Sequence, residues 1–391
     1  MGLAHFEPYV DDTTLRDGAQ MPGVRSTTIE ERVAIATALD ELGVERMEMF
    51  GAWYDVDRKA AQAVLDIGLK IRIAVWVRAS IPDIDDVLNR EGLKEIGISH
   101  PVSDIHLEHK LGISHEEALE RITTAVQYAT DHGLHVFFHG EDSTRCDWAF
   151  EQQVIQGIID AGAECYRVCD TVGVGLTTHS QTEEDFVKCV PDKIKAIAEQ
   201  FKIDIEFHGH DDFGGAVSNT LVALSNGAKW ASTTVLGMGE RAGNAETEKI
   251  IMNLQYHHNI QRYKIEKLTE ICQMVSKAFE LRIPTNKAIV GSGVFTHQSG
   301  IHTDGVIKHP ETYEPFTPES VGNVRHLLLG PYSGKAVLEW KIRQAAPNIE
   351  MNDVRVTALK DFFREIFETG IRVNPLTDAE FSNLLRMFLI T

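Results

Sequence analysis

Short apolar, β-branched runs alternate with longer helical patterns along the first 260 or so residues, and this alternation constrains the fold more than any other feature. Repeated βα units of this kind predict a parallel sheet. The expected strands cover residues 44–50, 70–77, 95–100, 135–142, 165–171, 203–210 and 230–237, with a short first strand near 7–13. Eight units favour a closed (β/α)8 TIM barrel. The alternative, an open doubly wound sheet, should carry a Gly-rich dinucleotide fingerprint after its first strand, and none is there.

Two helix starts in this region carry a recognisable signal. Thr28 stands three residues before Glu31, and Ser114 three before Glu117. Each pair is expected to satisfy free backbone donors as a capping box.

The pattern changes after residue 260. A helical segment at 266–281 is followed by a stretch rich in Gly, Ser and His at 291–316, with few apolar residues in register. Long loops inside compact proteins are usually functional or disordered, and the density of His, Asp and Tyr here favours function. We therefore predict a catalytic barrel over 1–260, followed over 261–391 by a linker and a small, mainly helical domain that contributes to the active site.

Composition excludes several kinds of partner. The formal net charge of -20 argues against nucleic acid and anionic membranes, because both repel an acidic surface. No apolar run approaches the length of a membrane span, and the first residues lack a secretory signal, so a cytoplasmic location is the default expectation. The five cysteines form no C-x-x-C pair and are expected to be reduced and mostly buried.

Polar residues gather where the predicted strands end, and in a TIM barrel these ends carry the active site. His208 and His210 are two residues apart on one strand, so both side chains can point the same way and converge on one ion. Asp17, in the D-T-T-L-R-D-G segment after the first strand, can add a carboxylate, and Arg16 a positive charge. Two histidines and one carboxylate leave coordination positions open, which suits a catalytic metal. The alternatives are hydrogen-bonded structural histidines and a surface ion pair.

Two further strand ends contribute candidates. The fifth predicted strand ends in H-G-E-D-S-T-R, which places Glu141 and Arg145 at the rim, although a carboxylate beside an arginine is often only structural. The last strand is followed by G-M-G-E-R-A-G-N, where glycine lets the backbone pass close to a ligand and Asn244 could reach the metal. Glu240 and Arg241 could equally form an ion pair at the mouth.

Four motifs occur together in this chain: D-T-T-L-R-D-G-A-Q at 12–20, H-G-H-D-D at 208–212, G-M-G-E-R-A-G-N at 237–244 and S-G-I-H-T-D-G at 299–305. In this order they resemble the DRE-TIM metallolyase family, and specifically its Claisen-condensing branch of isopropylmalate, homocitrate and citramalate synthases. The last motif distinguishes this branch from the lyases and aldolases that share only the barrel.

The resemblance implies a role for each matching residue. Asp17, His208 and His210 would bind a divalent metal (Mg, Mn, Zn, Fe or Co), with Asn244 as a further ligand. Arg16 would stabilise negative charge on the oxo group and the acetyl enolate.

The other implied residues serve the substrates and the proton transfers. Glu141 and His302 match the acid–base residues of the family, Tyr313 a tyrosine near the reacting centre, and Thr171 a threonine that contacts the carboxylate of the 2-oxo acid. Arg145 is a further candidate for substrate binding. Because His302 follows the barrel in sequence, it is expected to be delivered over the site by a partner subunit, in a homodimer with exchanged C-terminal segments.

The implied reaction condenses acetyl-CoA with a 2-oxo acid. Ala19, Asp211 and the strand end at 49–55 depart from the family pattern near the expected acceptor pocket, so they leave the acceptor open. 2-Oxoglutarate, giving homocitrate, is favoured; oxaloacetate or a phosphonate analogue comes next, and isopropylmalate or citramalate formation third. A retro-aldol lyase and a non-catalytic binding barrel are the alternatives from other classes.

Overall fold

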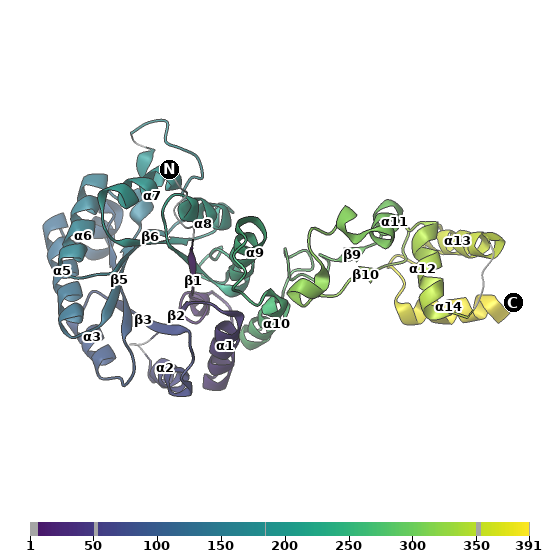
Figure 1. Ribbon diagram of the computed structural model, residues 1–391, viewed down its shortest axis with the longest axis horizontal. Coiled ribbons are helices and arrows are strands. Elements are labelled where there is room, and N and C mark those ends of the chain that lie inside the picture. The colour runs from purple at the N-terminus through teal and green to yellow at the C-terminus, as the bar shows by residue number, and fades with distance from the viewer. Residues whose placement is uncertain (1–6, 51–53, 184, 349–352, 391) are drawn as a thin grey trace. The chain divides into compact units, whose positions relative to one another are not determined.

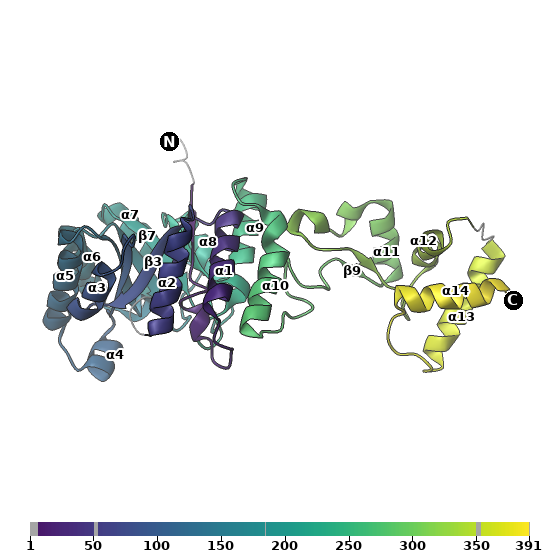
Figure 2. The same ribbon diagram turned by 90° about the horizontal axis from the view of Figure 1, so that it is seen from below.

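A computed structural model describes residues 7–50, 54–183, 185–348 and 353–390. The chain divides into two compact units, Met1–Arg282 and Ile283–Thr391. The division lies later than the boundary at 260 expected from the sequence. Helix α10 (Leu268–Phe279) accounts for the difference, because it packs against helix α1 (Ile29–Leu42) of the barrel unit (Figure 2).

The first unit is a closed barrel of eight parallel strands in sequence order, with β1 paired to both β2 and β8. The predicted (β/α)8 TIM barrel is confirmed, and helices surround the strands (Figure 1). The strands are β1 Tyr9–Asp12, β2 Arg46–Phe50, β3 Arg72–Arg78, β4 Glu95–Pro101, β5 His135–Glu141, β6 Cys165–Asp170, β7 Asp204–Gly209 and β8 Trp230–Thr233. Residues 51–53 of the unusual strand end lie outside the described residues.

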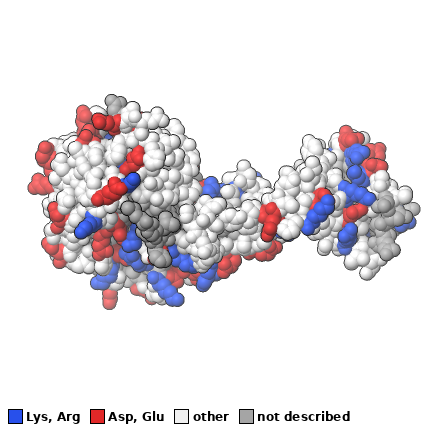
Figure 3. Space-filling view, turned by 45° about the horizontal axis from the view of Figure 1, so that its top comes forward, with Lys and Arg blue, Asp and Glu red and all other residues white. Residues whose placement is uncertain are grey.

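The remaining helices of this unit lie between or after the strands. They are α2 Asp55–Ile67, α3 Ile81–Leu88, α4 Asp104–His106, α5 His115–Asp131, α6 Trp148–Asp160, α7 Val190–Gln200, α8 Ala216–Ser225 and α9 Thr247–His258. All five cysteines of the chain are free and buried, as expected. Acidic and basic side chains are interspersed over the face seen in Figure 3, so on that face the charge is not gathered in one patch.

Both predicted helix starts cap a helix. Thr28 accepts a hydrogen bond from the backbone N–H of Glu31, whose side chain accepts one from the N–H of Thr28, and α1 ends at Gly43 with φ of 99°. Ser114 accepts the N–H of Glu117 at the start of α5, but the return bond that would complete the predicted capping box is not formed, and the Glu117 side chain pairs with Arg121.

We expect Thr28→Ala to lower the free energy of unfolding by about 1 kcal/mol, because the backbone N–H of Glu31 loses its side-chain acceptor. Urea denaturation followed by circular dichroism measures the change. Thr124→Ala, at an exposed position inside α5, is the matched control and should be nearly neutral. Equal effects of the two substitutions would contradict the capping assignment.

The second unit is mainly helical, as predicted. Its helices are α11 Gly300–Lys308, α12 Lys335–Ala345, α13 Asp353–Glu368 and α14 Asp378–Ile390, and strands β9 Thr296–His297 and β10 His326–Leu327 form a small parallel sheet. Its buried core contains Val337, Leu359, Phe363 and Phe381. No helix in the described ranges is long and apolar enough to cross a membrane.

Candidate metal and substrate site

Three side chains converge at the C-terminal end of the barrel. The Nε2 atoms of His208 and His210 lie 3.2 Å apart, and Asp17 Oδ2 is 3.6 Å from the first and 4.0 Å from the second. All three residues are buried. Two nitrogen ligands at about 2.0–2.1 Å from one tetrahedral ion would be separated by roughly 3.3 Å, so this spacing fits a shared cation.

The turn after β1 presents Arg16 and Asp17 to this point. Asp12, the last residue of β1, accepts hydrogen bonds from the N–H of Thr14 at 2.9 Å and from the hydroxyl of Thr247 at 2.7 Å. The hydroxyl of Thr14 in turn accepts the N–H of Val235 at 2.8 Å. These buried bonds tie the turn to the segments that follow β8, so the backbone holds both functional side chains in place.

Asn244 borders the same group. Its Nδ2 donates to Asp17 Oδ2 at 2.5 Å and to the carbonyl of Met238 at 2.9 Å. Gly239 makes room for it, because a Cβ at this glycine would lie 2.1 Å from Asn244 Nδ2 and 3.2 Å from Asp17 Oδ2, and its φ is 154°. Gly239, the second glycine of G-M-G-E-R-A-G-N, therefore provides space for the side chain of Asn244.

The donor set fits a divalent cation. Asn244 Oδ1 and His210 Nδ1 are buried without a hydrogen-bond partner. His208 Nδ1 lies 2.8 Å from the hydroxyl of Ser232, which orients the ring. Burial, with the neighbouring cationic side chains, lowers the pKa of His208 well below its usual value, and burial also lowers that of His210. Both rings are thus neutral, which is the form that binds a metal.

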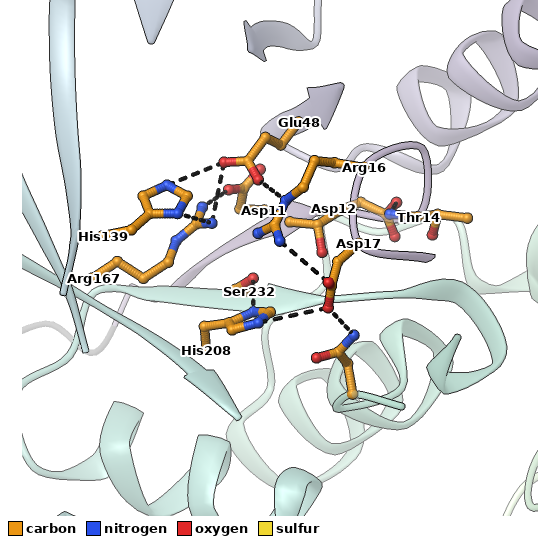
Figure 4. A network of polar contacts seen from close by, with 12 residues as sticks. Asp11, Asp12, Thr14, Arg16, Asp17, Glu48, His139, Arg167, His208 and Ser232 are labelled. Atoms are coloured by element: carbon orange, nitrogen blue, oxygen red, sulfur yellow. Dashed lines mark hydrogen bonds and ion pairs between the residues drawn. The ribbon is translucent and has the colours of Figure 1, made fainter. Parts of the chain in front are cut away.

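Arg16 belongs to an ionic network inside the barrel (Figure 4). Its Nε pairs with Glu48 on β2, and its Nη1 lies 3.3 Å from Asp17 Oδ1. Glu48 also pairs with Arg167 on β6 at 3.1 Å and with His139 on β5 at 3.2 Å. Glu48 therefore fixes the guanidinium of Arg16 beside the candidate metal ligands.

The ionic network extends from Arg167 to further buried side chains in the barrel interior. Arg167 pairs with Asp11 and, at 2.8 Å, with Glu206; Arg46 pairs with the same two carboxylates. All four side chains are fully or almost fully buried. TIM barrels usually fill this space with Val, Ile and Leu. The charged interior of this barrel therefore departs from the usual apolar filling.

Sequence reasoning missed Glu48, His139 and Arg167. The sequence of β2 contains a signal that could have revealed this network. Arg46 and Glu48 alternate there with Met47 and Met49. A strand with charges at every second position and apolar residues between them points one face at a polar interior.

The network makes stability depend on pH. Burial, with Arg167 nearby, lowers the pKa of His139 to about 3, against the opposing effect of Glu48. The unfolded chain, with an imidazole pKa of about 6.5, binds more protons at this histidine between these values, so the contribution of His139 to stability falls as pH drops below about 6.5, by up to roughly 1.4 kcal/mol per pH unit.

We expect His139→Gln to flatten this dependence between pH 6.5 and 5, as measured by urea denaturation at each pH. His109→Gln, at an exposed histidine, should leave the slope unchanged. An unchanged slope in His139→Gln would contradict the assignment.

A cavity of about 740 Å³ opens beside the metal ligands. Of the predicted site residues, it is lined by Arg16, Asp17, Glu141, Thr171, His208 and His210. The residues described as lining it do not include Arg145, which donates to Asp142 at 2.8 and 3.1 Å. They do not include Asp211 either, whose carboxylate accepts the N–H of Ala216 at the start of α8.

Glu141 stands at the cavity wall with two basic neighbours. Its Oε1 accepts a hydrogen bond from Lys110 Nζ at 2.6 Å and lies 3.1 Å from His106 Nδ1. Thr171 uses its oxygen to accept the N–H of Asp142 at 2.8 Å, which leaves its hydroxyl hydrogen for a ligand. Arg241 and Asp212 form an ion pair at the mouth, at 2.9 Å.

His302 and Tyr313 lie in the second unit. His302 is on α11, and its ring centroid is 4.2 Å from that of Tyr313. Both side chains are exposed in this unit. Their delivery to the barrel site stays a prediction.

The chain matches two protein families along most of its length. Residues 7–275 match the HMGL-like family, and residues 289–370 match the homocitrate synthase post-HMGL domain-like family. The two matches follow the division between the compact units.

Three curated relatives have similar sequences. The homocitrate synthase AksA of Methanopyrus kandleri is 38% identical, over 98% of this chain and 93% of that protein. The (R)-citramalate synthase CimA of Methanocaldococcus jannaschii is 38% identical, over 96% and 73%. The 2-isopropylmalate synthase 2 of Caldanaerobacter subterraneus is 39% identical, over 86% and 85%.

Solved structures share the barrel. The HMG-CoA lyase of Bacillus subtilis has a TM-score of 0.60 at 19% identity, covering 73% of this chain and 97% of that one. At this identity the likeness concerns the fold alone.

Proposed function

Because the chain belongs to the HMGL-like family, in the Claisen-condensing branch whose barrel is followed by a homocitrate-synthase-type domain, we propose that this enzyme joins the acetyl group of acetyl-CoA to a 2-oxo acid. The observation that carries the proposal is the convergence of Asp17, His208 and His210 beside Arg16 in one cavity. The relatives bear the names of synthases with three different products, so family membership leaves the acceptor open.

A divalent metal ion would be held by Asp17, His208 and His210, with Asn244 Oδ1 as a further ligand. When bound, it supplies Lewis-acid polarisation of the acceptor carbonyl. Thr171 offers a hydroxyl donor to the carboxylate of the 2-oxo acid. Arg16, fixed by Glu48, presents a positive charge where the oxo group and the enolate become negative, and charge placed in advance is effective in a buried site.

Glu141 removes a proton from the methyl group of acetyl-CoA, which then attacks the acceptor carbonyl carbon. His302, with Tyr313 beside it, supplies acid–base chemistry from the second unit. Water finally cleaves the thioester and releases CoA. A positioned base contributes typically about 10²–10⁴-fold to such a proton transfer.

The cavity wall supports an acceptor with a second anionic group. Arg78, Lys110 and Arg121 line it in addition to Arg16, and each of the first three also pairs with a carboxylate. We propose 2-oxoglutarate as the first acceptor to test, ahead of oxaloacetate or a phosphonate analogue. Acceptors without a second anionic group, as expected for isopropylmalate and citramalate synthases, are less suited to a wall with several cationic side chains.

The test mixes the purified chain, acetyl-CoA and Mg²⁺ or Mn²⁺ with a panel of 2-oxo acids and follows free CoA with a thiol reagent. Release that needs one acceptor, is lost after chelation and returns with metal supports the proposal and identifies the acceptor. No release with any acceptor would overturn it. Cleavage of a 2-hydroxy acid in the same preparation would then indicate a lyase, and metal binding without turnover a binding protein.

We propose further that the active enzyme is a homodimer in which His302 of one subunit serves the barrel of the other. Mixing inactive Asp17→Ala and His302→Ala subunits should then restore activity, because half the subunits pair as heterodimers and one of the two sites in each is intact. About one quarter of the wild-type rate is expected after exchange. No recovery, with exchange confirmed by mass spectrometry, would show that each subunit serves itself.

A further inference from the structure

We infer that His106 is a positioning residue for the reaction, acting through Glu141 as a proton relay supported by the buried carboxylate of Asp142. The inference rests on the proposed function, in which Glu141 takes a proton from the acetyl methyl group. His106 ends the short helix α4, next to the described cavity wall.

The imidazole of His106 lies between two carboxylates that are consecutive in sequence. Its Nδ1 is 3.1 Å from Glu141 Oε1, and its Nε2 is 3.7 Å from Asp142 Oδ2. Consecutive residues of a strand normally point to opposite sides. Asp142 leaves the strand in the left-handed conformation, with φ of 66°, and this turn lets both carboxylates approach one ring. A non-glycine residue in that region is uncommon and carries some strain.

Asp142 is held firmly. It is fully buried, its Oδ2 accepts the hydroxyl of Ser103 at 2.5 Å, and Arg145 donates to both of its oxygens. Ser103 also accepts the backbone N–H of His106 at 3.3 Å. One serine thus fixes the start of α4 and the carboxylate that faces the imidazole. This arrangement gives Arg145 a role in balancing the charge of Asp142.

A π-helix, η2 (Leu107–Leu111), follows α4 directly. It places Lys110 four residues after His106, and both side chains reach Glu141 Oε1. π-helical turns occur frequently at functional sites. The Lys110 ammonium donates to Glu141 Oε1 at 2.6 Å and favours the ionised form of that carboxylate. Glu141 is therefore ready to act as a base.

The other charged groups near His106 are engaged elsewhere. Asp104 on α4 pairs with His115 on α5 at 2.6 Å, and Glu108 faces the exposed His109. The groups that face the imidazole are accordingly Glu141, Asp142 and, across Glu141, Lys110.

The proton balance follows from these contacts. Glu141 takes a proton from the acetyl methyl group and becomes a neutral acid. It passes that proton to the unprotonated Nδ1 of His106 and becomes a carboxylate again. The resulting imidazolium keeps its original proton on Nε2, directed to Asp142, and lies between two carboxylates that stabilise it. The base is thereby ready for the next proton transfer.

His106→Asn tests the relay, because asparagine keeps a polar group near Nδ1 and cannot carry the proton. We expect kcat to fall by about 10²-fold with KM for acetyl-CoA little changed, and exchange of acetyl-CoA methyl deuterium into water to slow equally. In His106→Gly, added imidazole should restore part of kcat, increasingly as the pH rises and more imidazole is neutral. His109→Gln on the same π-helix is the matched control and should behave as wild type.

If His106 had only a structural role, its replacement would not selectively lower kcat and deuterium exchange, and imidazole would not restore activity. Thermal unfolding and metal content of His106→Asn report whether it folds. If His106→Asn is folded and its kcat stays within about threefold of wild type, or if imidazole does not restore the activity of His106→Gly, the relay is overturned. If the wild-type enzyme releases no CoA with any acceptor, both the proposed function and the relay are overturned. Normal wild-type release with an unaffected His106→Asn removes only the relay.

Discussion

Replacing Arg167 by methionine is expected to lower the free energy of unfolding by about 3–5 kcal/mol, the usual cost of removing one partner from a buried ionic group. Arg167 is wholly buried on β6 and contacts three carboxylates, those of Asp11, Glu48 and Glu206. Methionine fills much of the volume and leaves these carboxylates with less positive charge. The loss therefore reports the electrostatic contribution more than the packing contribution.

Urea denaturation followed by circular dichroism measures this change. Arg121→Met is the control, because Arg121 forms an exposed pair with Glu117 four residues earlier on α5, and such pairs contribute little. A loss below about 1 kcal/mol for Arg167→Met would mean that the remaining arginines compensate for the removed charge.

Asp17→Ala is expected to remove bound metal and to lower CoA release by about 10³-fold or more. Asp17 is the one carboxylate within reach of both His208 and His210, among the described residues. It also accepts from Asn244 and contacts Arg16, so its loss disturbs the metal ligands and the cationic group together. Lewis-acid assistance supplies several kcal/mol of transition-state stabilisation, and each 1.36 kcal/mol corresponds to about tenfold in rate.

Metal content after dialysis, measured by atomic emission, and thiol-detected CoA release check this expectation. Asp211→Asn is the matched control: it alters an acid next to His210 in sequence, and the amide oxygen can still accept the N–H of Ala216 at the start of α8. It should keep both metal and activity. Full metal binding by Asp17→Ala would contradict the assigned ligand set.

The order of elements and most of the metal site could be predicted from the sequence. Strands and helices alternate with clear periodicity, and parallel strands closing into a barrel bring their C-terminal ends together. His208 lies near the end of β7, His210 follows that strand, and Asp17 lies in the turn after β1, so placing the strands was enough to place these side chains at one end of the barrel. The same reasoning placed Glu141 at the rim and the family resemblance implied Thr171, and both line the cavity.

The sequence by itself thus determined the barrel, the convergence of the three candidate metal ligands and the family motifs, because each depends on local periodicity or on residues at strand ends. Only the tertiary structure decided the partners of Glu48, His139 and Arg167. These residues come from three strands and meet in the barrel interior, where burial makes a charge stable only if its partners are present. The contacts of His106 with Glu141 and Asp142 likewise depend on how two neighbouring strand ends fold toward each other. Gly239 packs closely against Asn244 because the loop after β8 folds back on itself. A local sequence pattern does not reveal this close approach.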